Sequence, residues 1–525
     1  MSLQKTVLLL LLFSGLFLSS TNASTCAITR GPYFQIARPK TVYVRWRTDV
    51  ACDSRVRFGL TSTNLNIIAE DSTLTTEHVI KIGGLDQFIR FFYSVGTRTT
   101  SLASGSSYRF RTNPEDHHPG IKLRVLALGN VGTADSNEIA VRNGYQTFTG
   151  SNQTHLVMLL GNNAYPSGTD SDYQKGLFNI YTTMLRQVSV IPTLGVADTA
   201  GSTNPPSSLP YFQIFTLPTA VEGGGVASGT EKYFSYNDNL MHIVCLDTQS
   251  SDLSPNGPML TWLKKDLAAN TFPWLIAYFS HSPYSKGNHD SDLEQKMIDA
   301  RSNILPILES YGVDLVLTGH SNSYERSYFI NGFYGSSNTV KSSNFIFKRD
   351  GREGSTGGQG VYHKPAGAKN AGAVYAVVGS SGKAVSGPLN HPAMFLSMAT
   401  LGSFVFDLYN NRLDAKFILA NGTVGDYFTI VKDNQKPSIT LTSPLNGATY
   451  SAPASIFFSA NASDIDTHLD RVAFFANSKR LFIDFSAPYT FTWTNVPAGT
   501  YSIYAETRDD LGATTRTSTI SVVVK

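Results

Sequence analysis

Side chains that could bind cations follow five predicted strands, at the point where each strand ends. The strands are the apolar parts of Leu126–Gly132, His155–Tyr165, Ile191–Asp198, Ile276–Tyr284 and Leu315–Tyr324. Continuous apolar runs that end at glycine or in a polar loop are typical of central strands in an α/β sheet. Ligands gather at the carboxyl ends of such strands. We therefore expect one site that contains Asn130, Asn162, Tyr165, His281, His320 and Asn322, and we expect Asp198 to cap or brace its loop.

In order and spacing, these loops resemble the motifs of the metallophosphoesterases, and within them of the purple acid phosphatases. The family motifs are GDxG, GDxxY, GNH[ED], VxxH and GHxH, and the corresponding segments here read GNVG, GNNAY, GVAD, YFSH and GHSN. The resemblance extends from about Ile28 to Ile430. It implies a central α/β/α sandwich and, for the intact family, a binuclear centre of iron with zinc, manganese or iron that hydrolyses phosphoric monoesters.

At five positions where the family has a metal ligand or a catalytic residue, this sequence has a different residue type. Asn130 and Asn162 stand where the resemblance places two aspartates, the second of which bridges the metals. Val196 replaces an asparagine ligand, Ala197 replaces the histidine that assists the leaving group, and Asn322 replaces a histidine ligand. An amide is neutral and its nitrogen is a donor, so it serves a cation poorly. The flanking residues keep the family form.

Three family ligands are retained, namely Tyr165, His281 and His320. Two neutral imidazoles hold zinc weakly, because a firm site uses three or four protein ligands. We therefore expect no cofactor and no firmly bound metal in this chain. The segment KGNHDSD, with His289 and Asp290, matches a family stretch at the rim that could meet substrate.

The resulting prediction is a protein with a phosphatase fold, no phosphatase activity and a role in binding. Two alternatives remain open. One is a weakly active acid phosphatase with a residual metal site, although loss of a positioned proton donor alone typically costs about 10²–10⁴-fold in rate. The other is a surface adhesion or scaffold protein that acts through its β-sandwiches. The ligand is unknown, with a phosphate ester or a surface glycan as the expected classes.

The order of the predicted elements indicates several domains in the 525 residues. Residues 1–23 have the basic start, short apolar stretch and small residues of a signal peptide. Short alternating strands predict a β-sandwich at 25–116, which resembles the fibronectin type III-like domain of purple acid phosphatases, and Trp46 is expected in its core. Strands alternate with helices over 120–432. A second sandwich at 437–525 resembles bacterial immunoglobulin-like modules.

Composition limits the partners and the compartment. The net charge of +3 and the absence of a basic run argue against nucleic acid binding. Apart from the predicted signal peptide, no apolar stretch is long enough for a transmembrane segment, so the sequence predicts a secreted or cell-surface protein. Cys26 and Cys52 either pair or stay free, and the Asp464-Ile465-Asp466 stretch favours a solvated loop over a calcium site.

Overall fold

The N-terminal domain is a strongly bent sheet wrapped around an aromatic core. The computed structural model describes residues 26–201, 208–353 and 358–525. The long strand β2 (Thr41–Gly59) pairs along its length with β3 (Ile67–Gly83), while its two ends pair with β1 (Ile28–Gln35) and β4 (Arg90–Gly96). Short strands β5 (Ser101–Ala103) and β6 (Arg109–Arg111) pair with β4. Trp46 is fully buried in the core, as predicted, and Cys26 and Cys52 form a disulfide.

Two sheets form the centre of the chain. The first has the order β17-β22-β21-β20-β7-β8-β9 and continues through the pairing of β9 with β1 into the sheet of the N-terminal domain, and the second has the order β10-β11-β12-β13-β18-β14-β19. Strands of the first sheet are β7 (Leu123–Leu128), β8 (Leu156–Leu159), β9 (Ser189–Pro192), β17 (Tyr362–Lys364), β20 (Gly402–Tyr409), β21 (Arg412–Leu419) and β22 (Val424–Lys432). Strands of the second are β10 (Phe234–Asp238), β11 (Met241–Cys245), β12 (Trp274–Phe279), β13 (Leu315–Thr318), β14 (Tyr324–Ser327), β18 (Val374–Val378) and β19 (Met394–Met398).

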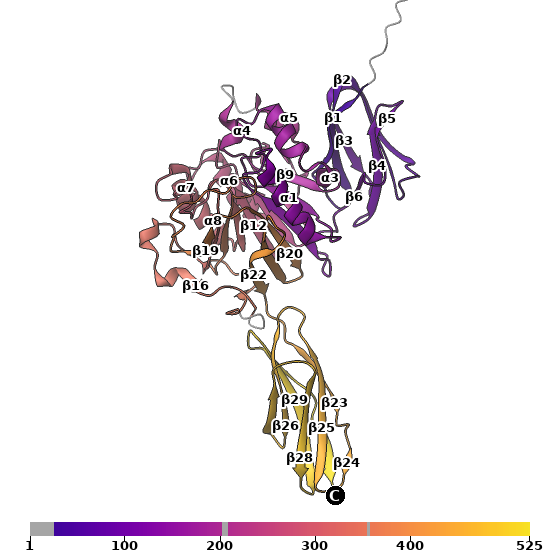
Figure 1. Cartoon of the computed structure of the whole chain (residues 1–525), viewed down its shortest axis with the longest axis vertical. Coiled ribbons are helices and arrows are strands. Elements are labelled where there is room, and N and C mark those ends of the chain that lie inside the picture. Colours follow the sequence, from indigo (N-terminus) through magenta and orange to yellow (C-terminus); the bar gives the residue numbers. More distant parts are fainter. Residues whose placement is uncertain (1–25, 202–207, 354–357) are drawn as a thin grey trace, which may run out of the picture.

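The two sheets pack face to face, and helices cover their outer faces (Figure 1). On β12, Ile276 and Tyr278 enter the core shared with the first sheet, whereas Ala277 and Phe279 enter a second core with helices α6 (Pro258–Ala269) and α8 (Leu305–Ser310). Successive side chains of a strand point to opposite faces, so a strand covered on both sides is apolar throughout. The α/β core is therefore as expected, but its expected single sheet is two packed sheets.

Parallel pairing brings the predicted site loops to the same edge. Strands β7, β8 and β9 are parallel neighbours, and so are β12 and β13. The loops are also joined directly, since the Asn130 N–H donates to the Gly161 carbonyl at 3.1 Å and the Gly319 N–H donates to the Ser280 carbonyl at 3.1 Å. The expectation that the loops meet at one place is confirmed.

The C-terminal domain is a sandwich that extends away from the central domain beyond β22 (Figure 1). One sheet contains β23 (Ser438–Ser443), β25 (Ala454–Ser463) and β28 (Tyr489–Val496). The other contains β24 (Thr449–Tyr450), β26 (Leu469–Ala476), β27 (Lys479–Asp484), β29 (Gly499–Asp509), β30 (Thr514–Arg516) and β31 (Ile520–Val524).

The junction between the central and C-terminal domains buries Asp466. Its Oδ2 accepts hydrogen bonds from Asn411 Nδ2 at 2.6 Å and from the Gln435 N–H at 2.8 Å. The interpretation of this stretch as a solvated loop is therefore wrong for Asp466, because contacts with the preceding domain cover it. The predicted signal peptide lies outside the described residues, and among the described residues no helix is long and apolar enough to cross a bilayer.

A buried ion pair anchors the strand that follows the GHSN loop. Arg326 on β14 donates to both carboxylate oxygens of Asp426, from Nε at 2.5 Å and from Nη2 at 3.0 Å, and both side chains are fully buried. The Tyr324 hydroxyl also donates to Asp426, at 2.8 Å. This pair fixes β14 to β22 and so holds the loop that carries His320 and Asn322.

We predict that Asp426→Asn destabilises the central domain by about 3–5 kcal/mol, because it leaves the Arg326 guanidinium buried without a counter-charge. Denaturant unfolding measures the change. Asp414→Asn, which removes a partly exposed partner of Arg412, is the control and should cost no more than about 1 kcal/mol. Equal losses in the two variants would contradict the anchoring role.

Candidate functional site

The three loop residues at the centre of the site share an unusual backbone conformation. Asn130, Asn162 and His320 have φ values of 54°, 54° and 61°. Residues other than glycine rarely adopt this left-handed region, and asparagine and histidine are among those that tolerate it best. Such turns let each chain reverse sharply at its strand end and place the side chain inward, where Asn130 and Asn162 are almost completely buried.

A chain of hydrogen-bonded amides occupies the centre of the site. The Ala197 N–H donates to Asn162 Oδ1 at 2.7 Å, and Asn162 Nδ2 donates to Asn130 Oδ1 at 3.0 Å. Asn130 Nδ2 then faces three oxygens, Asn322 Oδ1 at 2.8 Å and the carbonyls of His320 and Gly379 at 2.9 Å each. The amides at three substituted family positions thus satisfy one another.

Backbone groups fix the orientation of these amides. The Ala197 N–H can only donate, so the Asn162 oxygen must face it. The carbonyls of His320 and Gly379 can only accept, so the Asn130 nitrogen must face them. The direction of the whole chain, from the Ala197 N–H to the oxygen of Asn322, follows from these backbone groups.

The centre of the site therefore does not fit the binuclear metal pair of the family. Two cations about 3.5–4 Å apart need anionic oxygens, preferably a bridging carboxylate. In this chain, the Asn130 side chain directs its donor nitrogen to the place where the loops meet. The Asn162 oxygen already accepts a hydrogen bond from the Ala197 N–H. A cation placed among these groups would meet N–H hydrogens and no negative charge.

Asp198 braces the loops instead of binding a metal. It accepts hydrogen bonds from the N–H groups of Gly195 at 2.8 Å and Asn163 at 3.0 Å, and from the Tyr173 hydroxyl at 2.6 Å. Burial raises the pKa of Asp198 to about 6, against these hydrogen bonds, which lower it. The backbone segments are packed so closely that a Cβ on Gly195 would lie 2.2 Å from the backbone nitrogen of Asn162.

The remaining sequence-predicted residues lie around this centre without forming a ligand shell. Val196, at the start of α4 (Val196–Ala200), is exposed, and Ala197 is buried against Asn162. Tyr165 lies in the same loop as Asn162. Burial, and to a smaller extent the nearby charge of Asp198, raises the pKa of its phenol. Each of the substituted positions is thus close to the site, but none of them supplies a charge.

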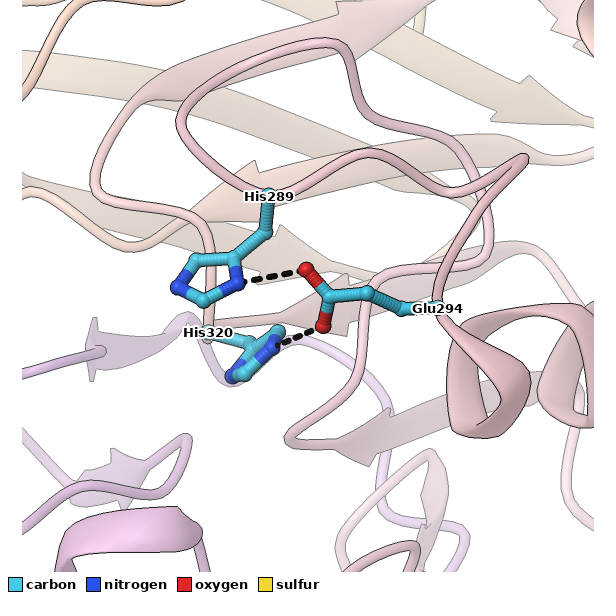
Figure 2. A group of neighbouring side chains, drawn as sticks. All are labelled: His289, Glu294 and His320. Atoms are coloured by element: carbon cyan, nitrogen blue, oxygen red, sulfur yellow. Dashed lines mark hydrogen bonds and ion pairs between the residues drawn. The ribbon is translucent and has the colours of Figure 1, made fainter.

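One retained histidine, His320, forms a group with His289 and Glu294 at the rim (Figure 2). The rings of His281 and His320 lie 4.5 Å apart, and the rings of His320 and His289 lie 3.9 Å apart. Glu294 connects two of them, with Oε2 2.8 Å from His320 Nε2 and Oε1 2.6 Å from His289 Nδ1. The structure therefore brings the rim residue His289 to the retained ligand His320.

Glu294 was missed by sequence reasoning, because it precedes helix α7 (Gln295–Asp299) and belongs to no motif quoted above. A signal was present, since it follows His289 by five residues and lies two residues beyond the stretch matched to the rim. Burial raises the pKa of Glu294, but hydrogen bonds from His320 and His289 outweigh burial and lower it to about 2. Burial also lowers the pKa of His281 well below its usual range and lowers that of His320.

Family comparisons agree with this architecture. Residues 123–324 match the family of calcineurin-like phosphoesterases. The central domain is a calcineurin-like phosphoesterase domain. Residues 437–505 match the family of bacterial Ig domains, so the C-terminal resemblance is also confirmed.

Purple acid phosphatases are among the homologues of this chain. Purple acid phosphatase 15 of Arabidopsis thaliana is 24% identical over 272 residues, which are 48% of this chain and 49% of the relative. Purple acid phosphatase 23 of the same plant is 23% identical over 272 residues, or 47% of this chain and 57% of the relative. The matches thus span about half the length of these curated relatives.

Solved structures show the same fold at lower identity. A purple acid phosphatase from yellow lupin (Lupinus luteus) seeds, PPD1, superposes with a TM-score of 0.59 and 17% identity, covering 78% of this chain and 74% of the lupin chain. A structure of PhoD superposes with a TM-score of 0.56 and 12% identity, covering 78% and 92%. At these identities the likeness establishes the fold alone.

We predict that Asn130→Asp destabilises the domain at pH 7 by at least about 1–3 kcal/mol, because a carboxylate would face the carbonyls of His320 and Gly379 without a donor. The pKa of the new carboxyl group would be raised in the folded state. Its penalty should therefore be absent at low pH and should grow as the pH rises through that raised pKa. Denaturant unfolding between pH 5 and 8 measures the difference from the wild type.

Asn137→Asp is the matched control, since Asn137 is exposed in the first turn of α1 (Ser136–Thr149), where a negative charge is tolerated. It should leave stability unchanged or slightly higher at every pH. An Asn130→Asp variant as stable as the wild type at pH 8 would show that the amide hydrogen bonds do not hold the centre together.

Proposed function

We propose that the central domain is a binding domain that has lost the phosphomonoesterase activity of its relatives. The observation that carries the proposal is the amide chain from the Ala197 N–H through Asn162 and Asn130 to Asn322. In a binuclear hydrolase the metals bind the phosphoryl oxygens and lower the pKa of the attacking water. Here hydrogen bonds satisfy the groups at that position, and the residues of the amide chain carry no carboxylate.

The proton chemistry is missing as well. Ala197 occupies the position of the family histidine that assists the leaving group. Its backbone N–H already donates a hydrogen bond to Asn162 Oδ1. Nearby acids offer no substitute, because Asp198 is buried against Tyr173 and three N–H or amide donors. Loss of a positioned acid typically costs about 10²–10⁴-fold in rate, in addition to the loss of metal activation.

A polar hollow beside the site suits the ligand classes expected from the sequence. It has a volume of about 420 Å³ and is lined by Thr248, Ser251, Ser254, Lys296, Asp299 and Asn303, among others. Thr248 joins the hollow to the site, since its hydroxyl lies 2.9 Å from His281 Nδ1. Hydroxyl, amide and ammonium groups together suit a phosphate ester or a sugar better than an apolar ligand. The predicted signal peptide supports action outside the cell or at its surface.

We predict that the wild-type protein, incubated with iron, zinc or manganese, does not hydrolyse p-nitrophenyl phosphate above the rate in buffer. The variant with Asn130→Asp, Asn162→Asp, Val196→Asn, Ala197→His and Asn322→His should bind two metal ions per chain and hydrolyse this substrate. Metal content by mass spectrometry and release of p-nitrophenol are the two measurements.

A fourfold variant that keeps Asn162 while it carries the other four changes is the matched control. Without the bridging carboxylate it should bind the metal pair weakly and stay inactive. Metal-dependent turnover by the wild type, with two ions per chain, would overturn the proposal and favour a weakly active phosphatase. A folded fivefold variant that remains free of metal would show that the motif positions were assigned wrongly.

A further inference from the structure

We infer that His289, Glu294 and His320 form a binding site for one divalent ion of the zinc type, at the rim of the domain, in which one retained family ligand is joined by two donors from outside the family's ligand set. This inference goes beyond the proposed function and does not depend on it, because two of its three donors, His289 and Glu294, lie outside the substituted centre. Only His320 is shared with the ligand positions of the family.

Convergence of the donor atoms is the first support. Ligand atoms of the three side chains all lie within 4.8 Å of one another, and Figure 2 shows the Glu294 carboxylate beside the two neighbouring imidazoles, with one oxygen facing each ring. Two histidines and one glutamate are a donor set that zinc uses where it keeps a fourth position open. A carboxylate supplies the negative charge that the amides at the centre of the site lack.

The distances leave room for an ion after a small adjustment. Ligands of tetrahedral zinc at about 2.0–2.1 Å from the ion lie about 3.3 Å from each other. The present separations from Glu294 are 2.6 Å to His289 Nδ1 and 2.8 Å to His320 Nε2, as expected for direct hydrogen bonds. The ion would take the place of the hydrogens that join the imidazoles to the carboxylate, and each pair would separate by less than about 1 Å.

His320 is held ready for this role. Its side chain is only 6% exposed, and its Nδ1 is buried without a hydrogen-bond partner among the described residues. A buried nitrogen without a partner costs free energy, and such atoms are rare. His320 therefore has Nε2 directed at Glu294, and coordination through Nε2 would place its remaining proton on Nδ1.

Access to the site is open from solvent. The side chains of His289 and Glu294 are 32% and 36% exposed, whereas His320 closes the inner side. A bound ion would therefore keep at least one position for water or for an anionic group of a ligand. This would give the binding domain a metal-dependent contact to a phosphate or carboxylate group without the second metal that hydrolysis in this family uses.

Zinc binding by the full-length protein tests the inference. After removal of metals with a chelator, titration with ZnCl₂ by calorimetry and metal content by mass spectrometry should give about one ion per chain. Cobalt(II) in the same site should show the intense visible absorption of a tetrahedral complex. Glu294→Gln and His289→Asn should each weaken zinc binding at least about tenfold, since even loss of a residue that only supports a metal ligand costs this much.

The matched control is Asp299→Asn, which removes a nearby carboxylate of α7 that hydrogen-bonds Gln295 and lies outside the cluster. It should bind zinc as the wild type does. His281→Asn separates the alternatives, because an ion held by the retained family pair would depend on His281 and His320 but not on Glu294. His289 and Glu294 are partly exposed, so their variants should fold, and circular dichroism confirms this.

Three results would overturn the inference: no zinc binding by the wild type, equal binding by Glu294→Gln, or binding that His281→Asn abolishes while Glu294→Gln retains it. Two ions per chain, one of which depends on Glu294, would support the rim site and contradict the proposed loss of the binuclear centre. The two proposals therefore fail through different observations.

Discussion

The site depends on one electrostatic requirement, which is that positive charge must face the carbonyl oxygens at the convergence of the loops. The carbonyls of His320 and Gly379 and the side-chain oxygen of Asn322 all point at the same atom, Asn130 Nδ2. In a low-dielectric interior, three oxygens cannot face one another without a donor or a cation. In this chain an amide nitrogen satisfies them, so the loops keep their arrangement without metal.

This substitution explains why the fold tolerates the loss of its charged ligands. Asparagine has nearly the shape of aspartate and adopts the left-handed backbone conformation that Asn130 and Asn162 require. Because both residues change together, the oxygen of one amide meets the nitrogen of the other. A single change from aspartate to asparagine would instead leave one carboxylate beside the new amide. The two amides thus satisfy each other's hydrogen bonds, and the contact between Asp198 and Gly195 holds the backbone around them.

The sequence predicted the parts of the structure that depend on local pattern. Strands β7, β8, β9, β12 and β13 and the meeting of their loops followed from apolar runs that end in polar turns. Helix α1 lies between β7 and β8, where the predicted alternation of strands and helices requires a helix, but its few apolar positions do not mark its bounds. The second sheet was missed, since strands buried on both faces read alike in one sheet or two. The contact between Glu294 and His320 joins residues 26 positions apart through tertiary folding, and no spacing rule indicates it.

Charge in this domain is arranged differently from what the family motifs imply. The centre, where carboxylates would bridge two metals, contains neutral amides that neither attract a cation nor leave a carbonyl unpaired. The one carboxylate among the retained and rim histidines is Glu294, and it lies outside that centre in partial contact with solvent. A phosphate held at the centre would meet no positive charge to stabilise a developing pentavalent group, whereas a ligand at the rim would meet His289, Glu294 and the nearby Lys296. The proposal of binding without hydrolysis rests on this arrangement, because the charged groups Glu294 and Lys296 lie at the rim and not at the centre of the site.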